Sequence, residues 1–229
     1  MRALRPAAKV AASAPLRATL TLGLILGGGR GAATMAAPTR FAYLHGFLAA
    51  PDAPDALALR TAFRERYDAH LELLDLNDEK GVTLEIPLAL ARVRDFVERG
   101  GDGGVVLLGR SYGAYVAAAA AAELGDRVEG LLLLCPAFDM YGRWASGASA
   151  AIGPADLAAW EAAGHRDFMR RGEAMRVPYA FAAAARDWPA FPAPPPRCTI
   201  GVLAGLRDDI VPPETVVEYA QREEVRERC

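Results

Sequence analysis

Cysteine is scarce in this sequence of 229 residues, and so is histidine. The three cysteines, Cys135, Cys198 and Cys229, have unrelated spacings, which excludes a disulfide framework and a cysteine-based zinc site. Long apolar runs are also missing: none reaches the roughly 20 residues of a membrane-spanning helix. We therefore expect no metal, no membrane span and, from the scarcity of thiols, a reducing compartment.

Acidic residues are missing from the first forty positions, which contain six of the 26 Lys and Arg residues. The remainder holds 20 basic and 28 acidic residues, and this acidic balance argues against nucleic acid as a partner. Residues 1–40 are typical of an organelle transit peptide or of a start codon placed before Met35; a secretory signal is the third alternative. We expect them to form a disordered extension, and the protein to be cytoplasmic, or in an organelle if the transit interpretation holds.

A glycine-rich stretch in this extension, LILGGGRGA (24–32), imitates a phosphate-binding loop. A Walker loop needs Gly-Lys-Ser/Thr, and a dinucleotide site needs a following helix and an acidic residue about 20 positions later. Neither is present. We predict no cofactor.

From residue 41 the sequence alternates between predicted strands and predicted helices. Five uniformly apolar stretches predict strands: RFAYL, LELLDL, GVVLLG, VEGLLLLCPAF and CTIGVLAGL. Strands of this composition are covered on both faces, so the sequence predicts an α/β fold, with a mostly parallel sheet and helices on both faces. Residues 139–197 break the rhythm and hold all three tryptophans. We expect a short helical cap there, with an irregular covering connection as the alternative.

The pentapeptide GRSYG places Ser111 between Gly109 and Gly113, after a predicted strand and before an alanine-rich helix. Small neighbours permit the strained turn that pushes a serine hydroxyl out of the sheet, and the helix directs its positive end at it. This context predicts a nucleophilic serine. The alternative is a serine that caps the helix.

A His-Gly turn, formed by His45 and Gly46, follows the first predicted strand. The backbone N–H groups of Phe47 and Tyr112 are the expected oxyanion hole, where each donor contributes roughly 3 kcal/mol of barrier lowering. We expect His45 to order the loop by hydrogen bonding.

Two carboxylates follow the last predicted strand, in the stretch LAGLRDDIVPPE. Asp208 is the expected acid that orients a catalytic imidazole, and Asp209 is the second choice. The alternative is that either carboxylate only stabilises the helix that begins near Pro213.

In this order the three motifs resemble the α/β-hydrolase fold and, more narrowly, the compact YqiA-type esterases. The similarity extends from about residue 41 to about 221. It implies hydrolysis of a small carboxylic ester or thioester through an acyl-serine intermediate, with Ser111 as nucleophile, Asp208 as orienting acid and the amides of Phe47 and Tyr112 as oxyanion hole.

The catalytic histidine that this resemblance implies, downstream of the acid, is not found. His45 and His70 lie in the wrong places for this role, and His165 is in the predicted cap. We therefore predict a hydrolase domain over residues 41–229 whose last strand and helix are missing, either truncated at its C-terminus or impaired. The alternatives are an inactive relative that binds a partner or ligand, and a site completed by His165 or by another subunit. Substrate identity and oligomeric state stay open.

Overall fold

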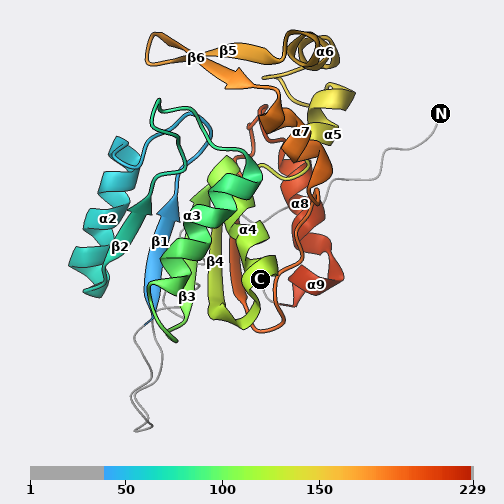
Figure 1. The fold of residues 1–229 in the computed structure, drawn as a ribbon. Helices are drawn as coiled ribbons and strands as arrows, with labels where there is room; N and C mark the ends of the chain where they lie inside the picture. Colours follow the sequence, from blue (N-terminus) through green and yellow to red (C-terminus); the bar gives the residue numbers. More distant parts are fainter. Residues whose placement is uncertain (1–38, 228–229) are drawn as a thin grey trace, which may run out of the picture.

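The computed structural model describes residues 39–227, and its centre is a five-stranded sheet (Figure 1). The order across the sheet is β2-β1-β3-β4-β7, and all neighbouring strands are parallel. Its strands are β1 (Arg40–Leu44), β2 (Leu71–Leu74), β3 (Val105–Arg110), β4 (Val128–Leu134) and β7 (Thr199–Leu203). These are the five predicted strands, and the predicted parallel sheet is confirmed. The predicted extension lies, except for its last two residues, outside the described residues.

Helices cover both faces of the sheet, as predicted. On one face α2 (Pro54–Tyr67) packs against β1, with the rings of Phe63 and Phe41 5.6 Å apart. On the other lie α3 (Ile86–Glu98), α4 (Tyr112–Leu124) and α8 (Pro213–Gln221), whose buried side chains share one core with Ala42 and Leu44. Two short elements, η1 (Gly125–Arg127) and α9 (Glu223–Arg226), complete this body.

The alternation of side chains along β1 explains why Phe41 to Leu44 are all apolar. Phe41 and Tyr43 belong to the core under α2, whereas Ala42 and Leu44 belong to the core under α3 and α4. Because successive side chains of a strand point to opposite faces, a strand covered on both sides has no solvent-facing position for polar residues.

The strand β7 is an edge of the sheet in the described part of the chain, where it pairs with β4. Apolar side chains are exposed along and after it: Leu203 is 37% exposed, Leu206 82% and Ile210 47%. An exposed apolar edge strand is a site of unwanted association.

Residues 139–187 lie at the carboxyl ends of the strands, and the chain after them leads back to the amino end of β7 (Figure 1). The segment contains α5 (Met140–Ser146), α6 (Pro154–Ala163), a two-stranded antiparallel hairpin of β5 (His165–Arg170) and β6 (Glu173–Pro178), and α7 (Ala180–Asp187). The hairpin corrects the prediction of helices alone.

The hairpin escaped prediction because its strands are mostly half-exposed and rich in arginine, so they lack a clear apolar face. The turn of the hairpin did have a signal in the sequence, the glycine at position 172. Arg171 and Gly172 both have positive φ, +51° and +88°, as a two-residue hairpin turn of type I′ requires.

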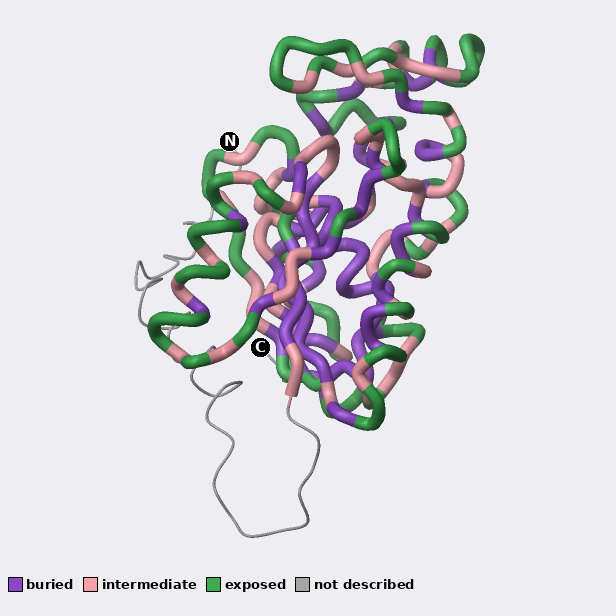
Figure 2. The backbone as a smooth tube through the Cα atoms, turned by 60° about the vertical axis from the view of Figure 1, so that its left-hand side comes forward, coloured by how far each residue is buried: buried purple, intermediate pink, exposed green. Residues whose placement is uncertain are grey.

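Burial separates the two parts of the molecule. In Figure 2 the buried backbone runs through the central strands and their neighbouring helices, while the hairpin is mostly intermediate or exposed. No helix among residues 39–227 is both long and apolar enough to cross a membrane. The carboxyl ends of the strands therefore lie between a buried core and a more exposed covering segment.

Candidate active site

Ser111 occupies a sharp turn between β3 and α4. Its backbone has φ +53° and ψ −117°, a conformation that costs a non-glycine residue free energy. Two backbone hydrogen bonds hold it against the end of β4: Ser111 N donates to Leu134 O at 2.8 Å, and Ala137 N donates to Ser111 O at 3.1 Å. The side chain makes no capping hydrogen bond to α4. The alternative of a helix-capping serine is therefore wrong.

The glycines on either side of Ser111 are required by close backbone contacts. A Cβ built on Gly109 would lie 2.4 Å from Gly113 O, and one on Gly113 would lie 2.2 Å from Leu44 O. Such distances are far inside van der Waals contact, so neither position accepts a larger residue without backbone movement. The glycines let α4 start directly against the end of β1.

Gly46 brings the loop after β1 to the same turn. A Cβ built on it would meet Ser111 Cβ and Arg110 O, each at 3.4 Å. His45, only 1% exposed, fixes this loop: its Nε2 accepts a hydrogen bond from Leu76 N at 2.9 Å, and its Nδ1 lies 2.9 Å from Gly46 O. Its Nε2 also lies 3.2 Å from Asp75 Oδ1 and 3.3 Å from Asn77 Nδ2. The ring thus connects Gly46, in the loop after β1, to the residues that follow β2.

A buried polar network, which we did not predict, continues from this loop. Thr83 Oγ1 accepts from Leu48 N at 2.7 Å and donates to Asn77 Oδ1 at 3.2 Å. Asn77 Nδ2 donates to Ala49 O and to Asp75 Oδ1, both at 2.9 Å. The two contacts that reach the loop, Thr83 with Leu48 and Asn77 with Ala49, join partners 35 and 28 residues apart in sequence, so no local motif predicts them. The network holds residues 46–49 in one conformation.

Phe47, one of the two expected oxyanion donors, follows Gly46 in the loop after β1, and Tyr112, the other, is the first residue of α4 and directly follows Ser111. Within residues 39–227, neither backbone N–H donates a hydrogen bond to another residue. The Tyr112 phenol is buried and donates to Leu84 O at 2.6 Å, and burial raises its pKa well above the usual range. It therefore stays protonated and anchors the start of α4.

The aromatic rings of the covering segment pack onto the loop after β1. The Phe47 ring lies 5.1 Å from that of Phe168 in β5 and 4.9 Å from that of Phe181 in α7. Trp160 in α6 continues the cluster, 5.3 Å from Phe168. Aromatic pairs at these distances contribute roughly 1 kcal/mol each beyond burial, so they tie the covering segment to the site.

Asp208 lies in the loop after β7. Its Oδ1 accepts hydrogen bonds from Ile210 N at 3.0 Å and Val211 N at 2.9 Å. Burial lowers the pKa of the nearby Arg143, and the carboxylates of Asp139 and Asp208 act in the opposite direction. Because β4 lies between β3 and β7, these two strands are about 10 Å apart. Ser111 follows the carboxyl end of β3 and Asp208 lies in the loop after the carboxyl end of β7, so both belong to the same end of the sheet.

The second choice, Asp209, has an exposed side chain, and its backbone carbonyl accepts from Ala150 N at 3.0 Å. Asp208 is thus the carboxylate built into the loop. Whether it also orients an imidazole stays a prediction.

All three histidines are among the described residues, and none is hydrogen-bonded to Ser111. His70 is exposed and immediately precedes β2, at the amino end of the sheet. His165 opens β5, and its Nδ1 lies 3.0 Å from Ala163 O. This part of the chain therefore offers Ser111 no imidazole partner.

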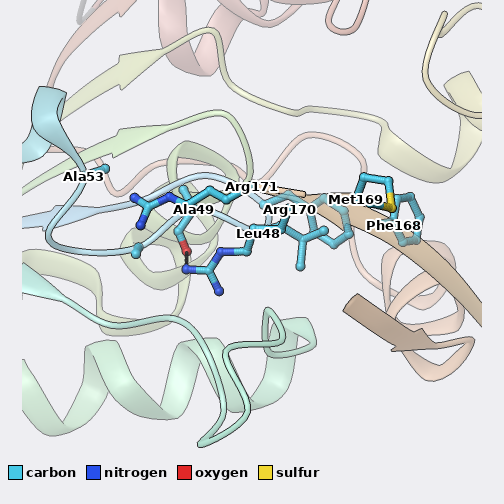
Figure 3. Close-up of a pocket in the computed structure, with 9 residues that line it drawn as sticks. Leu48, Ala49, Ala53, Phe168, Met169, Arg170 and Arg171 are labelled. Carbon is cyan, nitrogen blue, oxygen red and sulfur yellow. Dashed lines mark hydrogen bonds between the residues drawn. The ribbon is translucent and has the colours of Figure 1, made fainter. Parts of the chain in front are cut away.

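A cavity of about 450 Å³ lies beside the loop after β1 (Figure 3). One wall is formed by Phe47 and residues 48–50 and 53 of this loop, and the other by Phe168 to Arg171 of the hairpin. Its lining begins at Phe47, directly after the glycine that contacts Ser111.

No family model matches the sequence, and a search of curated proteins finds no match. Solved structures do match. The alpha/beta hydrolase domain-containing protein 10 from mouse superposes with a TM-score of 0.61 at 19% identity, over 83% of this chain and 77% of that one. The chain has the α/β-hydrolase fold. Est1E from Butyrivibrio proteoclasticus, solved with bound ferulic acid, gives a TM-score of 0.63 at 16% identity over 81% of this chain and 76% of its own.

A monoacylglycerol lipase from Paleococcus ferrophilus gives a TM-score of 0.62 at 14% identity, covering 81% of this chain and 79% of the lipase. At such identities the likeness concerns the fold. The narrower similarity to YqiA-type esterases stays a prediction.

Proposed function

We propose that this chain is a serine hydrolase that acts on carboxylic esters or thioesters through an acyl-serine intermediate. The observation that carries the proposal is the backbone of Ser111, held at φ +53° between β3 and α4 without a capping hydrogen bond. Strain of this kind persists only where surrounding contacts enforce it, and it is common at reacting residues. The names of two structural neighbours, a hydrolase from Agrobacterium vitis and the monoacylglycerol lipase, agree with this chemistry.

In the proposed reaction Ser111 Oγ attacks the carbonyl carbon of the ester and gives its proton to a base. The resulting oxyanion accepts hydrogen bonds from Phe47 N and Tyr112 N, which have no other acceptor within residues 39–227. The bond to the alcohol or thiol then breaks, and the leaving group takes the proton. Water repeats the sequence on the acyl-serine and releases the acid.

In this proposal none of the three histidines of the sequence is the base, because none is hydrogen-bonded to Ser111. The base is supplied from elsewhere. The nucleophile and the oxyanion donors alone retain a fraction of the catalysis, roughly 10³–10⁴ over water in serine hydrolases that lose a triad member. The described domain by itself is thus expected to be a slow esterase, and in this proposal Asp208 orients an added imidazole.

Added imidazole tests the proposal. Hydrolysis of 4-nitrophenyl butyrate is measured with increasing imidazole for the wild type and for Ser111→Ala, whose rate gives the reaction of imidazole itself. We expect a rate above that of Ser111→Ala by at least about tenfold, rising with imidazole until it saturates. Equal rates for both proteins would overturn the proposal.

The second candidate is a binding protein that keeps the fold without the reaction. The unpartnered state of Ser111 in the described part of the chain favours it. A protein of this kind shows no Ser111-dependent rate at any imidazole concentration, yet still binds a small ligand in the cavity beside Phe47.

A further inference from the structure

The turn of the hairpin places two adjacent arginines over the loop after β1, and they differ in what they contact. Arg170 donates from Nη1 to Gly81 O at 2.7 Å and from Nη2 to Ala49 O at 3.3 Å. These bonds connect the hairpin to the body. The guanidinium of Arg171 has no hydrogen bond or ion pair to any residue between 39 and 227.

The remaining residues cannot supply a side-chain carboxylate to Arg171, because positions 1–38, 228 and 229 contain no Asp or Glu. In Figure 3 the Arg171 side chain extends from the hairpin across the loop toward Ala53, apart from the guanidinium of Arg170. Arg171 is exposed, but it lines the cavity. Within residues 39–227, the permanently charged guanidinium of Arg171 thus has no partner, and it lies at the border of the cavity.

Apart from Arg170 and Arg171, the side chains that line the cavity are apolar. Phe47, Leu48, Ala50 and Phe168 supply hydrocarbon surface, and the ring of Phe47 is fixed between two other rings. The volume of about 450 Å³ lies within the range of roughly 300–1,000 Å³ for small-molecule sites. Two cationic side chains line the cavity, and Arg170 already donates to two backbone carbonyls, so Arg171 is the cation left to bind a ligand. This arrangement complements a small molecule with a hydrocarbon body and an anionic end.

We propose that this cavity is the subsite for an arylalkyl or short alkyl carboxylate group of the substrate, whose anion pairs with Arg171. The inference rests on the proposed function for its place in catalysis, since the lining begins at Phe47, one residue after Gly46, where a Cβ would lie 3.4 Å from Ser111 Cβ. It names the substrate class: esters that carry a free carboxylate. The guanidinium donates two parallel N–H hydrogen bonds to the two carboxylate oxygens, an arrangement that a neutral amide cannot reproduce.

Binding, rather than turnover, tests this inference. Cinnamate and its neutral counterpart cinnamamide are titrated into the full chain with ¹³C-methyl-labelled methionine, and the signal of Met169, which lines the cavity and is 70% exposed, reports occupancy. We expect cinnamate to bind about tenfold more tightly than cinnamamide, and the preference to fall with added salt. Equal affinities would overturn the inference.

Three variants sharpen the result. Arg171→Gln should abolish the preference for cinnamate and leave cinnamamide binding unchanged. Arg176→Gln, on the neighbouring strand and ion-paired with Asp167, makes the same change in net charge and should have no such effect. Should Arg171→Gln disturb the hairpin, Asp52→Asn serves instead: it removes a negative charge from the cavity loop and should tighten cinnamate binding alone.

The outcomes separate the two proposals. Cinnamate binding that depends on Arg171, without a Ser111-dependent rate in imidazole, supports the carboxylate subsite and overturns the hydrolase. A Ser111-dependent rate together with equal binding of both probes, or with none, overturns the subsite and leaves the hydrolase standing.

Discussion

Gly113 lies against the carbonyl oxygen of Leu44, so closely that a Cβ at residue 113 would be 2.2 Å from it. Gly113→Ala should therefore force α4 away from β1 and lower the free energy of unfolding by about 3 kcal/mol. Urea unfolding followed by circular dichroism measures the change. Gly153→Ala is the control, because its Cβ meets only Asp156 Oδ2, at 3.7 Å; it should cost less than about 1 kcal/mol. Similar losses in both variants would contradict the tight contact.

His45 should stabilise the protein through its ring. His45→Ala leaves the buried Leu76 N–H without its acceptor and frees Gly46 O, so we expect a loss of about 1–3 kcal/mol in unfolding free energy. His70→Ala, at an exposed position, should change it by less than about 0.5 kcal/mol. If the two variants unfold at the same urea concentration, the hydrogen bonds of His45 do not fix the loop.

Two variants of Asp208 separate the hydrogen-bond acceptor role of its side chain from its charge. Asn retains an oxygen that can accept from Ile210 N and Val211 N, so Asp208→Asn should stay within about 0.5 kcal/mol of the wild type, whereas Asp208→Ala should lose about 1–3 kcal/mol. Thermal unfolding of both variants decides. Equal destabilisation by Asn and Ala would show that the loop needs the charge rather than the acceptor.

Acid should weaken α6 through Asp156. The Gly153 N–H, then the Arg166 guanidinium, lower the pKa of this carboxyl below its usual value. A lowered pKa in the folded state means stabilisation that is present above the unfolded value of about 4 and is lost as the pH falls through the lower folded value.

The wild type should therefore be more stable than Asp156→Asn near neutral pH, and the difference should vanish at about pH 2. Fluorescence of the buried Trp160, on the same helix, follows the transition. A difference that does not depend on pH would exclude this ion pair as its cause.

The sequence predicted those features whose cause is local. The turn at Ser111 depends on two nearby glycines and on a strand and helix that adjoin it, and all of these are visible within about a dozen residues. The parallel sheet was predictable because each strand is apolar on both faces. The position of Asp208 after the carboxyl end of β7 followed from its place in the sequence after the last predicted strand.

Features that depend on tertiary neighbours were not predictable in this way. Thr83 and Asn77 look like ordinary loop residues until the fold brings them under residues 48 and 49. Arg171 resembles the other arginines of residues 166–176, and only its lack of a described partner beside the cavity distinguishes it. The hairpin itself was missed because its half-exposed strands show no strong alternation.

The most direct measurement is the chemical reactivity of one hydroxyl. The full chain is treated with a fluorophosphonate in the presence and absence of imidazole, digested, and mapped by mass spectrometry. The account predicts an adduct on Ser111 that forms faster with imidazole and is missing in Ser111→Ala. An unmodified Ser111 in imidazole, while the protein remains folded, would contradict it.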